Sequence, residues 1–177
     1  MYRSLAGLAL LSTVLTGPAL AQGRETEFGA DMVVKWMKSS GGGSGVFHIQ
    51  TPVDFRVAFH TGGNVAFEPR LTALYLSGGG DNMYSLDPGL NVLIGLPGST
   101  RTNGSYVTIG ADLELVGGSG LTGVSYYSVN AGLGLRRPMG KAATRAELFV
   151  GFTPKQGTTI AESIITLGAR LGISFFN

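Results

Sequence analysis

Hydrophobic and polar residues alternate with a period of two along most of the chain, most clearly between Val46 and Leu76. From Phe47 to Phe59 the odd positions are almost all apolar, whereas the even positions carry Asp54 and Arg56. Such alternation predicts a β-strand whose two sides face different surroundings. The turn-forming residues His60–Asn64 then lead into a second alternating segment, so this stretch predicts a β-hairpin.

The same pattern predicts eight strands and no helix beyond the N-terminal segment. The expected strands are about Glu25–Met37, Phe47–Phe59, Val65–Leu76, Tyr84–Leu96, Tyr106–Val116, Gly123–Leu135, Thr144–Phe152 and Ser163–Phe176. The segments between them predict loops, among them Ser77–Asn82 and Arg136–Ala143. Pro52, Pro69 and Pro88 fall inside predicted strands. Because proline donates no ladder hydrogen bond, we expect bulges there, or strands that end earlier.

Charge separates completely between the two faces of these strands. The apolar faces carry no Asp, Glu, Lys or Arg, as expected of a lipid-facing surface, where a charge costs roughly 2–4 kcal/mol near the midplane. The polar faces are rich in Gly and Ser and carry charges of both signs, and their basic residues are mostly Arg, which pairs well with carboxylates in a confined space. The charged residues on the polar faces are Glu27, Asp31, Lys35, Asp54, Arg56, Glu68, Arg70, Asp87, Asp112, Glu114, Arg136, Arg145, Glu147 and Arg170. We expect all of them except Asp87 and Arg136 to form a charge network that fills the lumen.

Aromatic residues on the apolar faces fall at two levels if the first strand runs outward and the strands then alternate in direction. Phe28 to Trp36 spans about 26 Å of strand, which a tilt of about 40° reduces to roughly 20 Å along the membrane normal, near the height of an apolar band between aromatic girdles. The inner level holds Phe28, Phe59, Phe67 and Phe175, and the outer level holds Trp36, Phe47, Tyr75, Tyr84, Tyr127 and Phe152.

The first 21 residues predict a cleaved signal peptide. Arg3 supplies the positive start, Leu5–Val14 forms a short apolar stretch, and Ala19–Ala21 has the small-x-small pattern of a cleavage site. The apolar stretch is too short to span a membrane as a helix. Residues 22–177 would then form one exported domain.

The composition limits the function classes. Without Arg3 the chain has 12 basic and 11 acidic residues, which argues against a nucleic-acid-binding surface. The absence of cysteine excludes disulfides, thiol catalysis and Cys-based metal sites. Glycine is abundant, at 29 of 177 residues, and falls in turns and on one face of the strands.

Together, the signal sequence LTGPALA, the alternating strands and the final strand IITLGARLGISFF resemble the small eight-stranded outer-membrane β-barrel proteins of Gram-negative bacteria. The resemblance implies an all-β, antiparallel up-and-down transmembrane barrel in the cell outer membrane. Its partners would be outer-membrane lipid and the barrel-insertion machinery, which reads a terminal Phe in this family. Here that motif is displaced by one residue, because the chain ends Phe175-Phe176-Asn177. The chain would be a monomer.

Few residues suggest chemistry. His48 lies on a polar face with Asp54 six residues on, a weak candidate for a general base that is more simply a hydrogen-bonding lumen residue. His60 reads as a solvated turn residue, and the two histidines lack metal-ligand spacing. The segment GGGSG lacks the Lys-Ser/Thr ending of a phosphate loop. No His on an apolar face matches the lipid A deacylase barrels.

We therefore expect no enzyme, no cofactor and no metal. The leading interpretation is an outer-membrane barrel with a filled, charge-paired lumen and a structural or surface-interaction role, using outer loops such as Ser39–Gly45 and Thr153–Glu162. One alternative is a narrow pore for ions or small solutes. Another is a soluble periplasmic lipocalin-like barrel, which would turn its apolar face inward around a ligand.

Overall fold

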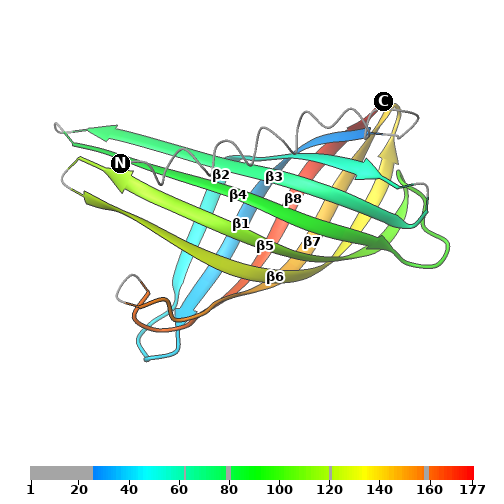
Figure 1. Ribbon diagram of the computed structural model, residues 1–177. Helices are drawn as coiled ribbons and strands as arrows, with labels where there is room; N and C mark the ends of the chain where they lie inside the picture. The colour runs from blue at the N-terminus through cyan, green and yellow to red at the C-terminus, as the bar shows by residue number, and fades with distance from the viewer. Residues whose placement is uncertain (1–25, 62, 79–80, 120, 158–159) are drawn as a thin grey trace.

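The computed structural model describes residues 26–61, 63–78, 81–119, 121–157 and 160–177, of which 48–53, 76, 78, 81 and 121–122 are described by their backbone alone. These residues form a closed antiparallel barrel (Figure 1). The strands are β1 (Thr26–Ser39), β2 (Val46–His60), β3 (Val65–Gly78), β4 (Asp81–Gly95), β5 (Gly104–Gly118), β6 (Leu121–Met139), β7 (Ala142–Thr153) and β8 (Ile164–Phe176). Each strand pairs with its sequence neighbour and β8 pairs with β1, so the sheet closes on itself. The β2–β3 ladder is the shortest, running from Asp54↔Thr72 to His60↔Ala66. The predicted fold class is confirmed.

The predicted signal peptide, residues 1–21, lies outside the described residues. Within the described part of the chain, no helix has the length and hydropathy needed to cross a membrane.

The strands are longer than predicted, and two predicted loops are wrong. The segment Arg136–Ala143 is mostly strand, because β6 continues to Met139 and β7 begins at Ala142. Only a tight turn separates them, and Gly140 adopts there a φ of 62°, which a side chain would disfavour. The segment Ser77–Asn82 likewise belongs largely to β3 and β4. Strand pairing thus overrides the local turn signals, because each added residue pair provides hydrogen-bond partners for backbone N–H and C=O groups.

The three prolines behave differently from one another. Between the pairs Asp31↔Asp54 and Val33↔Gln50, β1 contributes one residue and β2 contributes residues 51–53, so a bulge includes Pro52 as expected. Pro69 and Pro88 lie opposite partners in an unshifted β3–β4 register, so the bulges expected there are wrong. The bulge at Pro52 adds two residues to β2, which preserves the alternation of its faces on either side.

The two ends of the barrel are distinct. We call the end that holds Thr26 and Phe176 the terminal end, and the opposite end the loop end. The loop end carries the connections 40–45 and 154–163, which lie side by side in Figure 1 because β1 and β8 are paired. The backbone nitrogen of Ser40 donates to the carbonyl oxygen of Ser163 over 2.8 Å. The Ser39 hydroxyl donates to Glu162 over 2.7 Å.

The barrel has an inverted polarity compared with a water-soluble protein. Among the described residues, 7 hydrophobic and 15 polar or charged residues are buried, whereas 25 large hydrophobic residues are exposed. The exposed set includes Leu148 at 70% and Tyr75 at 66%, while Glu27 and Glu68 are fully buried. The alternation seen in the sequence therefore places apolar side chains outside and charges inside. This arrangement excludes the lipocalin-like alternative, which requires an apolar interior.

Candidate functional site

The lumen holds a continuous network of ion pairs that begins at the terminal end around Glu27. Its carboxylate lies 2.5 Å from Arg56 Nη1 and 2.7 Å from Arg136 Nη2. Ser174 donates its hydroxyl to the same carboxylate over 2.7 Å, and His60 Nε2 lies 3.2 Å away. His60 is therefore a lumen residue at the end of β2, and its interpretation as a solvated turn residue is wrong. It completes the polar surroundings of a carboxylate that water cannot reach.

A second group of ion pairs occupies the middle of the lumen around Arg145, which is almost fully buried. Its guanidinium contacts Glu68 and lies 2.7 Å from Glu147, while its Nε donates to the Tyr106 hydroxyl over 2.5 Å. Glu68 also lies 3.7 Å from Arg56, which joins this group to the terminal-end group. The planar fork of arginine allows one side chain to satisfy several partners in this confined space.

A third group lies toward the loop end around Asp54, which contacts Arg70 and lies 3.8 Å from Arg170. Arg170 also contacts Glu147, and Asp31 lies 3.0 Å from Arg56, so all three groups are connected. We call the whole network the charge plug. It consists of Glu27, Asp31, Asp54, Glu68, Glu147, Arg56, Arg70, Arg136, Arg145 and Arg170, all at most 5% exposed.

The charge plug is balanced, with five arginines and five carboxylates. Balance matters because an unpaired buried charge costs several kcal/mol. The plug also separates two cavities, one of about 120 Å³ at the loop end and one of about 90 Å³ at the terminal end. The terminal-end cavity is lined by His60 and Arg136, and the loop-end cavity by Asp54, Arg70 and Arg170 among others. Members of the charge plug therefore line both cavities, Arg136 at the terminal end and Asp54, Arg70 and Arg170 at the loop end.

Glycines on neighbouring strands provide the room for these large inward side chains. A Cβ on Gly134 would lie 2.0 Å from the Tyr106 ring, and one on Gly29 would lie 2.3 Å from the Arg56 guanidinium carbon. Both glycines sit on the lumen side, beside a strand that projects a large residue. The glycine enrichment of the polar faces is thus explained by packing inside a narrow barrel.

Sequence reasoning missed several lumen residues. Tyr106 is 2% exposed and stacks against Arg136 and Arg145, whose guanidinium carbons lie 4.8 and 5.0 Å from the ring centre. Phe149 faces Arg170 at 4.0 Å. Both share the parity of charged lumen residues on their own strands, so a strict extension of the alternation would have found them. The side chain of His48, the candidate general base, lies outside the described residues.

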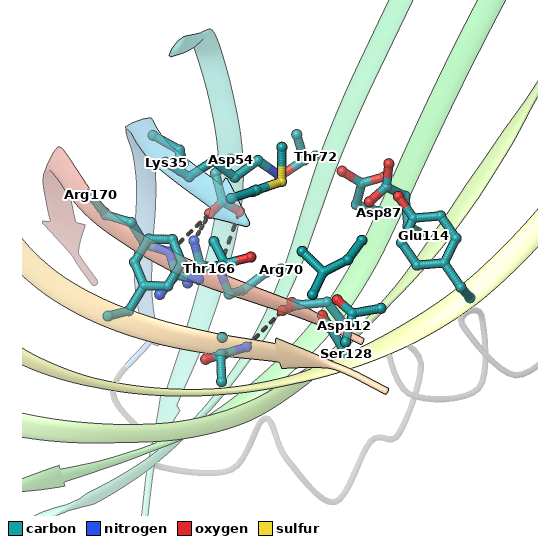
Figure 2. A pocket seen from close by; sticks show the side chains of 18 residues that line it. Lys35, Asp54, Arg70, Thr72, Asp87, Asp112, Glu114, Ser128, Thr166 and Arg170 are labelled. Atoms are coloured by element: carbon teal, nitrogen blue, oxygen red, sulfur yellow. Dashed lines mark hydrogen bonds and ion pairs between the residues drawn. The ribbon is translucent and has the colours of Figure 1, made fainter. Parts of the chain in front are cut away.

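The remaining charges of the polar faces are outside the plug. Lys35, Asp87, Asp112 and Glu114 line the loop-end cavity, as Figure 2 shows together with Arg70 and Arg170. Among the residues that the structure describes, no group of three or more His, Asp or Glu side chains is placed to hold a metal.

Eight of the ten aromatic residues predicted to form girdles lie opposite one another in cross-strand pairs, whereas Tyr127 and Phe152 lie opposite aliphatic residues. The register places Phe28 opposite Phe175 and Phe59 opposite Phe67 near the terminal end. It places Trp36 opposite Phe47 and Tyr75 opposite Tyr84 near the loop end. Exposed members of the set, 44–66% accessible, are Phe28, Phe47, Phe67, Tyr75, Tyr84, Tyr127, Phe152 and Phe175.

Comparison with solved structures identifies the architecture. Ail, the attachment invasion locus protein of Yersinia pestis, superposes with a TM-score of 0.53 at 10% sequence identity, covering 87% of this chain and 99% of Ail. Neisserial surface protein A superposes with a TM-score of 0.55 at 13% identity, covering 85% of this chain and 96% of its own. The chain has the fold of the small Gram-negative outer-membrane β-barrels. No protein-family profile and no curated protein sequence matches it.

Proposed function

We propose that this chain is an integral outer-membrane protein with an occluded lumen, acting as a structural or surface-interaction component of the cell envelope. The observation that carries the proposal is the inverted polarity of the barrel, in which apolar side chains cover the outside and the balanced charge plug fills the inside. A bilayer accommodates the apolar outside, because a closed barrel pairs most of its backbone groups between neighbouring strands. The paired aromatic residues at two levels fit the girdles expected at the membrane surfaces.

The loop end is the candidate interaction surface. Connection 154–163 is held against β6, because the Gln156 side chain accepts from the Tyr127 backbone nitrogen over 3.0 Å and donates to its carbonyl oxygen over 2.8 Å. It is also tied to connection 40–45 by the Ser39–Glu162 hydrogen bond. These hydrogen bonds hold the described parts of the two connections in place, which lowers the entropic cost of binding a partner.

Two segments of the chain would serve export and assembly. Residues 1–21 would direct export, and the last strand, ending near Phe175 and Phe176, would engage the barrel-insertion machinery. The ladder extends to the last residue, since Asn177 donates its backbone nitrogen to Thr26 over 3.0 Å. The barrel closes within one chain, which fits a monomer surrounded by lipid.

The first test is to refold residues 22–177 in detergent and to compare gel mobility with and without boiling. We expect a mobility shift that appears only on boiling, because a folded barrel resists the loading detergent. In planar bilayers we expect no discrete conductance steps, because the charge plug fills the lumen. A chain that is soluble without detergent and runs at one position would refute the membrane assignment. Discrete steps would refute occlusion and favour the narrow-pore alternative.

A further inference from the structure

The ring of aromatic side chains at the terminal end is interrupted on one side of the barrel. The strands β8, β1, β2 and β3 carry an outward aromatic residue near this end, namely Phe175, Phe28, Phe59 and Phe67. The outward positions near the same end of β4, β5, β6 and β7 hold Ile94, Ser105, Arg137 and Thr144. One half of this end therefore has a polar surface where the other half has aromatic rings.

Two exposed cations lie in the polar half. Arg137 is the next outward position after Leu135 on β6, and Thr144 of β7 lies opposite it. Its Nη1 donates to the Asn103 side-chain oxygen over 3.3 Å. Lys141 is exposed in the tight turn between β6 and β7. Ala142, the first residue after this turn, pairs with Phe175, so the cations lie at the same end of the apolar surface as the aromatic half (Figure 1).

The barrel offers these cations no carboxylate among its described residues. Of the acidic side chains that the structure describes, only Glu162 is exposed, and it lies at the loop end. The others belong to the charge plug or line the loop-end cavity. An anionic group at the membrane surface is therefore the available counter-charge for Arg137 and Lys141.

The surface next to the cations is apolar and faces outward. Leu135 pairs with Ala146, and Leu133 pairs with Leu148 one outward position further along the two strands. Leu133 is 57% exposed and Leu148 is 70% exposed. A phospholipid has the matching arrangement, with an anionic phosphate above apolar chains. Arginine suits phosphate in particular, because its planar fork donates two hydrogen bonds to phosphate oxygens.

We propose that the outward surface at the terminal end of β6 and β7 binds the phosphate of an anionic phospholipid, with Arg137 and Lys141 as its cationic ligands. The acyl chains then lie along Leu133, Leu135 and their partners on β7. The aromatic half anchors the barrel at the same membrane surface through its rings, whereas this half anchors it through charge. The inference rests on the proposed membrane location and adds the class of lipid and the residues that bind it.

The test is native mass spectrometry of refolded residues 22–177, released from micelles of a zwitterionic detergent. Phosphatidylglycerol and phosphatidylcholine with the same acyl chains are added in equal amounts, and the lipid molecules that stay bound are counted. We expect the wild type to retain phosphatidylglycerol preferentially. Arg137→Gln/Lys141→Gln should lower this preference at least about tenfold, because each cation near an anionic lipid contributes about fivefold. The mobility shift on boiling checks the fold of each variant.

Lys38→Gln/Lys155→Gln is the matched control, because it removes two exposed cations from the loop end. This variant has the same net charge as the test variant and should keep the preference. The proposal is overturned if the control loses as much preference as the test variant, since attraction would then depend on overall charge. Release of the bound lipid by excess inorganic phosphate would also overturn it, because the site would then take a soluble anion.

The failure of this inference is distinct from the failure of the membrane assignment. A wild-type barrel that shows the boiling shift but retains the two lipids equally would refute the lipid site alone. A wild-type chain without the shift would refute the membrane assignment and the lipid site together.

Discussion

Arg145→Met is the sharpest perturbation of the charge plug, because it removes the guanidinium at its centre while keeping most of the side-chain volume. The lost partners are Glu68, Glu147 and the Tyr106 hydroxyl. Four arginines then face five carboxylates. Among the residues that the structure describes, Glu68 then keeps one ionic partner, Arg56 at 3.7 Å.

The expected cost follows from the burial of the remaining carboxylates. Removing one member of a buried ion pair typically destabilises a protein by about 3–5 kcal/mol. Both carboxylates keep another arginine, since Arg170 still contacts Glu147, so we expect the lower end, about 3 kcal/mol. Glu68→Gln added to Arg145→Met restores the balance and should recover part of the loss, with a coupling energy in the range of about 0.5–3 kcal/mol.

The assay is urea unfolding of the barrel in lipid vesicles, followed by the fluorescence of Trp36, the only tryptophan. Trp36 lies on the outer face opposite Phe47, so its emission reports the transfer from lipid to water. The reasoning is refuted if Arg145→Met unfolds at the wild-type urea concentration. It is also refuted if the double variant is less stable than Arg145→Met, because charge balance would then not govern the lumen.

Two further predictions test the outer surface and the packing of the lumen. Leu113→Arg changes an outward position that is 42% exposed, and the buried charge should cost roughly 2–4 kcal/mol in lipid. We expect this variant to fail to assemble, as judged by gel mobility, whereas Glu114→Gln should assemble normally. The opposite result would mean that the two faces of the strands are reversed. Gly134→Ala should lower the urea concentration at the unfolding midpoint, because its Cβ would lie 2.0 Å from the Tyr106 ring. Gly63→Ala is the control, since no atom lies within 4 Å of its Cβ, and it should leave the midpoint nearly unchanged. Equal effects of the two substitutions would contradict the packing argument.

The face of each strand was predictable because alternation is a local property. A residue such as Glu114 keeps its side of the sheet whatever the strand pairs with, and even the bulge near Pro52 leaves the alternation intact because it adds two residues. Pro69 and Pro88 were misjudged for a related reason. A missing donor removes one ladder bond, but the neighbouring pairs on both sides hold the register.

The partners inside the lumen were not predictable, because they depend on the closure of the whole barrel. Glu27 and Arg136 are 109 positions apart and meet only because β1 and β6 face each other across the lumen. His60 was misjudged on the same ground, since its turn-like neighbours are visible in the sequence but Glu27 beside it is not. The side of the sheet on which a residue lies follows from its neighbours in the same strand. Which side chains meet across the lumen depends in addition on the register of every strand between them. The five-to-five balance of the plug therefore constrains the barrel globally, and a register slip in one strand would leave buried charges unpaired on both sides of the lumen.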